Sequence, residues 1–179
     1  LKHEDRIAFV AAFHQQFFNK LTATLNLRKG FVTGFDVPFT PAFGLDYLAL
    51  SKEKYVLNVS GNVAKSYRVP TFNDRFWEPG GNPDLLPEKG MNYELGSKLS
   101  FCDDDYSGNI KLNAFYMNVD NWILWKNGGS YWYAENVQQV ESKGIELMTD
   151  WAYKIGKLKT NSGLNYTFTS AQRAASKNN

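Results

Sequence analysis

The stretch YVLNVSGNVAK, residues 55–65, alternates apolar and polar side chains at every second position. Its odd-numbered positions carry the apolar series Tyr55, Leu57, Val59, Gly61 and Val63. The even-numbered positions between them include Asn58, Ser60 and Asn62. Because successive side chains of a β-strand point to opposite faces, this pattern predicts a strand with one apolar and one polar face.

The same two-residue period recurs along the whole chain. Seven further stretches show it: 7–13, 21–27, 43–47, 93–99, 112–116, 145–147 and 164–168. No segment has a convincing helical period, and the best helical candidate is one or two turns at residues 70–77, which begin with a proline. The sequence therefore predicts an all-β fold, an antiparallel up-and-down meander of about eight strands.

The predicted connections alternate strictly between short and long. Short ones fall near residues 18–20, 51–54, 102–107 and 154–157, and long ones near 33–40, 66–89 and 126–136. Aromatic rings flank every short connection. In an up-and-down sheet all short turns then lie at one end, which is typical of bacterial outer-membrane barrels with interfacial aromatic girdles.

Composition narrows the class of protein further. The chain has 179 residues, of which 13 are Phe, 10 Tyr and 5 Trp, and its formal net charge is only +2. This balance gives no reason to expect a nucleic-acid partner, and a single cysteine excludes an internal disulfide framework. Since the chain starts inside a strand pattern and ends in a polar stretch, we expect a segment of a larger barrel.

Three sequence elements follow one another from the end of the fourth predicted strand into the fifth. They read RVPTFND at residues 68–74, GNPDLLPE at 81–88 and YELG at 93–96. In this order and spacing they resemble the barrel domain of TonB-dependent outer-membrane receptors. PAFGL at 41–45, residues 118–125 and GIEL at 144–147 extend the resemblance over most of residues 41–168.

The resemblance implies a 22-stranded transmembrane barrel, of which residues 1–179 would form part, with the plug domain absent from this chain. It also implies a bacterial outer-membrane receptor that imports a siderophore-iron complex or cobalamin. The implied partners are outer-membrane lipid, that ligand, and the TonB energy-coupling complex acting through the missing plug. No cofactor is implied.

The motif residues are expected to be structural, because prolines and glycines can fold such a loop back onto the barrel wall. Charged members would pin the loop there rather than touch a ligand. The set is Arg68, Pro70, Asp74, Asn82, Pro83, Pro87, Glu88, Glu94 and Gly96.

The candidate ligand-binding surface is an aromatic stretch around a Gly-Gly pair, expected in an extracellular loop. Its members are Trp122, Trp125, Tyr131, Trp132 and Tyr133. Rings with polar tips suit a bulky ligand, although the same residues could form an outer girdle or pack the loop.

Enzymatic function is not predicted, since no nucleophile, general base or zinc motif is recognisable. The run Asp103–Asp105 could bind calcium, but a solvated acidic turn is the ordinary outcome. Two other classes stay open, a passive porin-type barrel and a soluble carbohydrate-binding β-sandwich.

The alternation also predicts which side chains face lipid and which face a wet lumen. Outward residues are Leu57, Val59, Val63, Leu95, Leu99, Leu112, Ala114, Leu164 and Tyr166. Inward residues are Asn58, Ser60, Asn62, Lys111, Asn113 and Asn165.

Overall fold

The computed structural model describes residues 3–173 and contains eight strands and one short helix. The elements are β1 (Arg6–Phe17), β2 (Leu21–Val32), β3 (Phe39–Ser51), β4 (Tyr55–Arg68), α1 (Phe72–Phe76), β5 (Glu88–Cys102), β6 (Tyr106–Asn127), β7 (Trp132–Ile155) and β8 (Leu158–Arg173). Each stretch of two-residue alternation lies inside one of these strands, and the helix lies within residues 70–77. The predicted eight-stranded meander is therefore confirmed.

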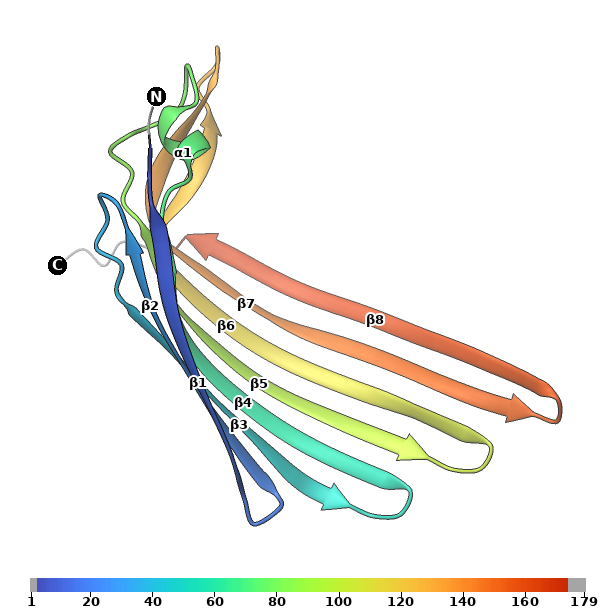
Figure 1. Ribbon diagram of the computed structural model, residues 1–179. Coiled ribbons are helices and arrows are strands. Elements are labelled where there is room, and N and C mark those ends of the chain that lie inside the picture. The colour runs from blue at the N-terminus through green and yellow to red at the C-terminus, as the bar shows by residue number, and fades with distance from the viewer. Residues whose placement is uncertain (1–2, 174–179) are drawn as a thin grey trace.

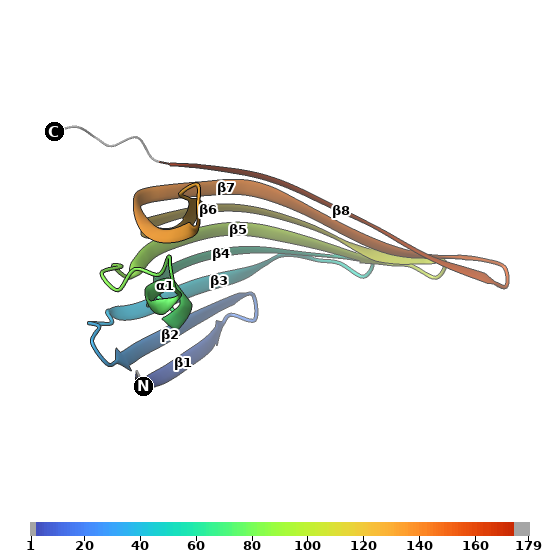
Figure 2. The ribbon, with the colours of Figure 1, turned by 90° about the horizontal axis from the view of Figure 1, so that it is seen from above.

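The strands form one sheet in the order of the sequence, and each pairs antiparallel with the next (Figure 1). The four short turns lie together at one end, as predicted, while the longer connections and α1 lie at the other end. Figure 2 shows that the sheet curves and stays open, so that β1 and β8 form its two edges within the described residues. No helix in residues 3–173 is long and apolar enough to cross a membrane.

The register confirms that the predicted outward and inward residues divide between the two faces of the sheet. Val59 aligns through Ser97 with Leu112, Leu147 and Tyr166 along one row. Neighbouring rows hold the other predicted outward side chains, and the inward set alternates with them. We call these the apolar face and the polar face.

Two details differ from the sequence prediction. Residues 126–136 are not a long loop, because β6 and β7 continue as a hairpin with only residues 128–131 between them. The fifth strand does not begin at residue 93, where the alternation starts, because β5 already begins at Glu88 and so places Glu94 and Gly96 well inside it. Local alternation could not show either, since turn residues and strand residues are mixed in both stretches.

The β6–β7 hairpin extends beyond the rest of the sheet. Asn121 has a φ of 56°, in the left-handed region, while the register of the two strands continues without a shift from Asp120–Gln139 to Trp122–Val137. Figure 1 shows the ends of both strands rising beside α1. The hairpin end and the loop of residues 69–87 form what we call the cap.

Candidate functional site

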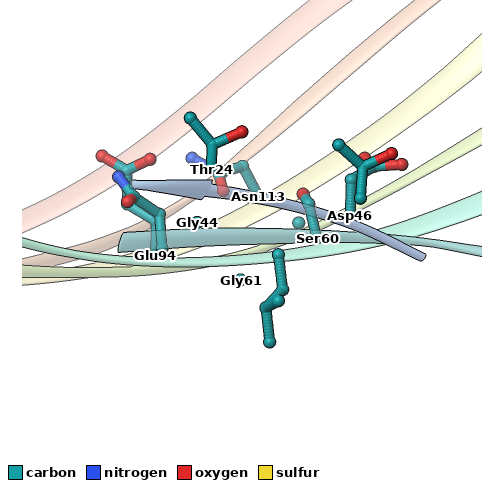
Figure 3. Close-up of a pocket in the computed structure, with 11 residues that line it drawn as sticks. Thr24, Gly44, Asp46, Ser60, Gly61, Glu94 and Asn113 are labelled. Carbon is teal, nitrogen blue, oxygen red and sulfur yellow. The ribbon is translucent and has the colours of Figure 1, made fainter. Parts of the chain in front are cut away.

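A hollow on the polar face runs across five strands. Thr24 of β2, Asp46 of β3, Ser60 of β4, Glu94 of β5 and Asn113 of β6 line it, and Figure 3 shows their side chains on the same side of the sheet. Most of these groups can donate or accept hydrogen bonds, as expected for the inside of a large barrel. The predicted inward residues Ser60, Asn62 and Asn113 are among its lining.

Gly96 keeps the centre of this hollow open. A Cβ atom there would lie 2.8 Å from the Ser60 hydroxyl oxygen and 3.5 Å from Oδ1 of Asn113. A larger residue would therefore push both polar groups aside. Glu94, two residues earlier on the same face, is exposed and pairs in register with Asn62.

The cap loop begins with a buried turn and a capped helix. Val69 and Pro70 are buried, which fixes the chain as it leaves β4. The Thr71 hydroxyl accepts a hydrogen bond from the Asp74 amide at 3.1 Å, and the Asp74 carboxylate accepts one from the Thr71 amide at 2.9 Å. This reciprocal capping box stabilises a helix of only five residues.

Three charged motif residues meet at the base of the cap. Arg68 donates from Nε to Glu88 at 2.7 Å and from Nη2 to its other carboxylate oxygen at 2.5 Å. Nη1 of Arg68 lies 3.3 Å from the Asp74 carboxylate. Both acids are buried. Arg68 and Glu88 thus form a bidentate ion pair, and Asp74 is a further acceptor for the same guanidinium group. In this geometry a partly buried ion pair is stabilising.

Asp74 is held in its charged form by this cluster. Burial alone would raise the pKa of its carboxyl group, but hydrogen bonds from Thr71 and Trp125 and the positive charge of Arg68 outweigh burial and leave the pKa below its ordinary value. The carboxylate is therefore a fixed acceptor at neutral pH.

The same cluster holds the hairpin. Glu88 accepts the Ile123 amide at 2.9 Å, and Asp74 accepts the Trp125 indole N–H at 3.1 Å. The buried side chains of Leu85, Ile123 and Ala134 pack together, with Trp125 against them. Two carboxylates of the motif thus connect the barrel wall, α1 and the β6–β7 hairpin.

Gly80 brings the loop backbone against the hairpin backbone. Its carbonyl oxygen accepts the Ala134 amide at 2.8 Å. A Cβ atom on residue 80 would lie 1.7 Å from the Trp132 carbonyl oxygen, so that only glycine permits this approach.

Asn136 joins the loop to Asn121 of β6, a role that the sequence did not assign to it. Its side-chain oxygen accepts the Leu86 amide at 2.8 Å, and its Nδ2 group donates to the carbonyls of Leu86 and Asn121. Nearby, the Asn121 side chain reaches the Pro87 carbonyl, and the Asn82 amide donates to the Asp74 carbonyl. Pro83 is exposed beside Asn82.

A second unpredicted cluster surrounds Arg75. Its guanidinium group lies 5.0 to 5.1 Å from the ring centres of Phe35, Phe72 and Phe76. It also forms an ion pair with Glu4, whose side chain is only 3% exposed. Burial would raise the pKa of Glu4, but the ion pairs with Arg6 and Arg75 lower it overall. Because Phe72 and Phe76 lie near Arg75 in the sequence, the ring contacts could have been predicted. No local feature of the sequence indicated that Glu4 would pair with Arg75.

The five ligand candidates do not form one surface. Strand alternation places Trp125 and Trp132 on the side of the hairpin that faces residues 69–87, and Trp122 and Tyr133 on the other side. The Trp125 indole N–H donates a hydrogen bond to Asp74, whereas Tyr131 and Trp132 are 48% and 58% exposed at the hairpin tip. Their ligand role stays a prediction.

The acidic turn carries an ion pair. Lys54 Nζ lies 2.6 Å from the Asp103 carboxylate, and this pairing lowers the pKa of Asp103. Among the described residues no group of three or more His, Cys, Asp or Glu side chains could hold a metal ion.

Two aromatic rows border the apolar face. One lies at the short turns and consists of Tyr47, Tyr55, Phe101, Tyr106, Trp151 and Tyr153. The other consists of Phe9, Phe31, Phe43, Tyr93, Tyr116 and Phe168; Tyr93 lies eight residues from Phe101 on β5 and Tyr116 lies ten from Tyr106 on β6, whereas Phe43 lies only four from Tyr47 on β3. A tilted strand needs about 9–11 residues to cross a bilayer. The geometry is therefore that of a transmembrane β-barrel wall.

Comparison with known proteins narrows the class. A family model described as TonB dependent receptor-like, beta-barrel matches residues 4–179. The vitamin B12 transporter BtuB of Photobacterium profundum is 34% identical over 101 residues, which are 54% of this chain and 16% of that protein. The vitamin B12 transporter BtuB of Vibrio vulnificus strain YJ016 is 28% identical over 148 residues, which are 80% of this chain and 22% of that protein.

Solved structures show the same fold at low identity. The siderophore receptor PirA from Pseudomonas aeruginosa has a TM-score of 0.68 and 17% identity, covering 93% of this chain and 32% of that one. The copper transporter OprC has a TM-score of 0.66 and 16% identity, covering 93% and 28%. The chain belongs to the β-barrel family of TonB-dependent receptors, which is a receptor family rather than an enzyme family. It spans about a fifth of the length of the curated relatives above.

Proposed function

We propose that this chain forms part of the wall and extracellular cap of a bacterial outer-membrane receptor that imports a bulky, scarce nutrient. The observation that carries the proposal is the apolar face bordered by two aromatic rows on a strand array of this family. Lipid would contact this face, and the polar face would line the lumen. Residues 1–179 would be barrel only, and a plug domain elsewhere in the receptor would connect it to TonB.

Cobalamin is the first ligand to test, and a ferric siderophore is the second. Support for cobalamin comes from relatives whose names state vitamin B12 transport. A siderophore stays the second ligand because the sequence resemblance implies it, whereas the similarity to the siderophore receptor PirA argues for the fold alone. The exposed Tyr131 and Trp132 would contact the ligand, while Trp125 would position the hairpin.

The alternatives are less well supported. A carbohydrate-binding sandwich needs two packed sheets, whereas the strands of residues 3–173 form one. A passive porin shares the barrel wall, but the family match and the pinned cap favour a receptor.

An uptake assay tests the proposal. The full-length gene is expressed in a bacterium that lacks its own cobalamin receptor, and labelled cyanocobalamin uptake is measured with and without TonB. We expect uptake that requires TonB, and a parallel assay with ferric siderophores decides the second ligand. Passage of small sugars independent of TonB, without uptake of either ligand, would overturn the proposal in favour of a porin.

A further inference from the structure

Three lysines project from the apolar face, one level with its second aromatic row and two just beyond it. Lys65 of β4 follows outward Val63, and Lys143 of β7 precedes Ile145 on the same face. Lys89 of β5 also faces this side, because the adjacent Gly90 points to Ser66 on the polar face. The three side chains come from three different strands.

All three lysines lie at a similar height along the wall. Lys65 is ten residues from the start of β4, Lys143 is twelve residues from the end of β7, and Lys89 is thirteen residues from the end of β5. These ends are all at the short turns. A crossing of about 9–11 residues therefore puts the three ammonium groups at the level of lipid headgroups on the cap side.

The three ammonium groups form no ion pair within the described residues. In residues 3–173, Lys54 and Lys126 form ion pairs with Asp103 and Glu135, but Lys65, Lys89 and Lys143 have neither an ion pair nor a side-chain hydrogen bond.

Two acids share this face with the three lysines: Asp120 pairs in register with Lys89, and Glu141 lies two residues before Lys143 on β7. Gln139 donates to Asp120 at 3.1 Å, and the Tyr116 hydroxyl interacts with Glu141. These neutral donors leave both carboxylates charged, so the rim carries three ammonium groups and two carboxylates, and the lysines form no ion pair with them in residues 3–173.

Tyrosines alternate with these lysines. Tyr67 pairs in register with Lys89, and Tyr116 pairs with Lys143. Amphipathic rings favour the membrane interface, and lysines near a charged membrane surface are attracted to anionic lipids. Both residue types thus fit the headgroup layer.

We propose that Lys65, Lys89 and Lys143 form a docking surface for phosphate-bearing lipid headgroups in the leaflet on the cap side. The lipid would lie with its acyl chains on the apolar face and its phosphate among the three ammonium groups. This inference rests on the membrane placement in the proposed function, but it is independent of the imported ligand.

The test compares the full-length receptor with two triple variants in bilayers of phosphatidylcholine, with or without phosphatidylglycerol. The first variant is Lys65→Gln/Lys89→Gln/Lys143→Gln. The control, Arg28→Gln/Lys98→Gln/Lys111→Gln, removes the same charge from the polar face. Native mass spectrometry of the extracted protein measures the retained phosphatidylglycerol, and added inorganic phosphate tests whether a free anion competes.

We expect the rim variant to lose phosphatidylglycerol affinity about fivefold per lysine, or roughly 100-fold in total. The control variant should retain the lipid, and inorganic phosphate should not displace it. Equal retention by both variants, or displacement by phosphate, would overturn the lipid site while leaving the proposed function intact. Failure of the unmodified receptor to insert into either bilayer would overturn both.

Discussion

The wall and the cap are ordered by different means. In the wall, all fourteen residues of β4 pair with β5, so that the backbone ladder sets the position of every side chain. In the cap, contacts of Arg68, Asp74, Glu88 and Asn136 join segments that are up to 51 residues apart in the sequence. The effect of a substitution on stability should therefore depend in the wall on which face the residue occupies. In the cap it should depend on which hydrogen-bonding partner is lost.

Arginine substitutions at adjacent positions of β4 should separate the two faces most strongly. Val59→Arg places a charge in the middle of the apolar face and should cost about 2–4 kcal/mol in a bilayer. Asn58→Arg faces the polar hollow beside Ser60 and should cost far less. Unfolding in lipid vesicles measures both, and similar costs would contradict the facing of β4.

Removal of Glu88 should be the most damaging change in the cap. Glu88→Ala leaves Arg68 and the Ile123 amide without their acceptor and should cost about 2–3 kcal/mol, less than a fully buried pair because the Arg68 side chain is 45% exposed. Urea unfolding in detergent measures the loss, and the exposed Glu53→Ala serves as control. A loss no greater than that of the control would show that the cluster does not hold the cap.

A methyl group at Gly80 should separate the loop from the hairpin. Gly80→Ala is expected to cost about 1–2 kcal/mol, because its Cβ would overlap the Trp132 carbonyl. Hydrogen exchange at the Ala134 amide should accelerate. Gly44→Ala is the matched control, since its nearest neighbour would be 3.8 Å away, and unchanged exchange in both variants would argue against the docking.

The charge of Asp74 should make a smaller, pH-dependent contribution of about 1 kcal/mol. Since the folded state lowers the pKa of Asp74, its stabilisation is complete above the ordinary aspartate pKa of about 4 and is lost as the pH falls through the folded value. The stability difference between the native chain and Asp74→Asn should therefore shrink on acidification. A difference that grows at low pH would refute this sign.

The wall could be predicted from the sequence because its information is local. From Tyr55 to Val63 successive side chains alternate between the two faces of β4, so that a strand assignment shifted by one residue would place apolar side chains on the polar face. The helix at residues 72–76 was also predictable, since Pro70 and Thr71 mark its start.

The cap could be predicted only in part. The motif identified Arg68, Asp74 and Glu88, whose contacts the structure now describes, but alternation does not encode the positive φ of Asn121. The roles of Asn136 and Glu4 depend on partners 50 and 71 residues away, for which a single sequence gives no local signal. The aromatic residues 122–133 lie on two sides of the hairpin because β6 and β7 continue as strands through this stretch, where the sequence predicted a loop.

The central claim, that one face of this sheet meets lipid and the other meets water, is tested most directly by labelling along β4. Single cysteines at positions 57, 58, 59, 60, 62 and 63, in a Cys102→Ser background of the full-length receptor, carry a nitroxide label in bilayers. Collision rates with oxygen, which dissolves in lipid, and with a water-soluble nickel chelate report the surroundings of each label. We expect high oxygen accessibility at 57, 59 and 63 and high chelate accessibility at 58, 60 and 62. Accessibility without this two-residue period would contradict the account.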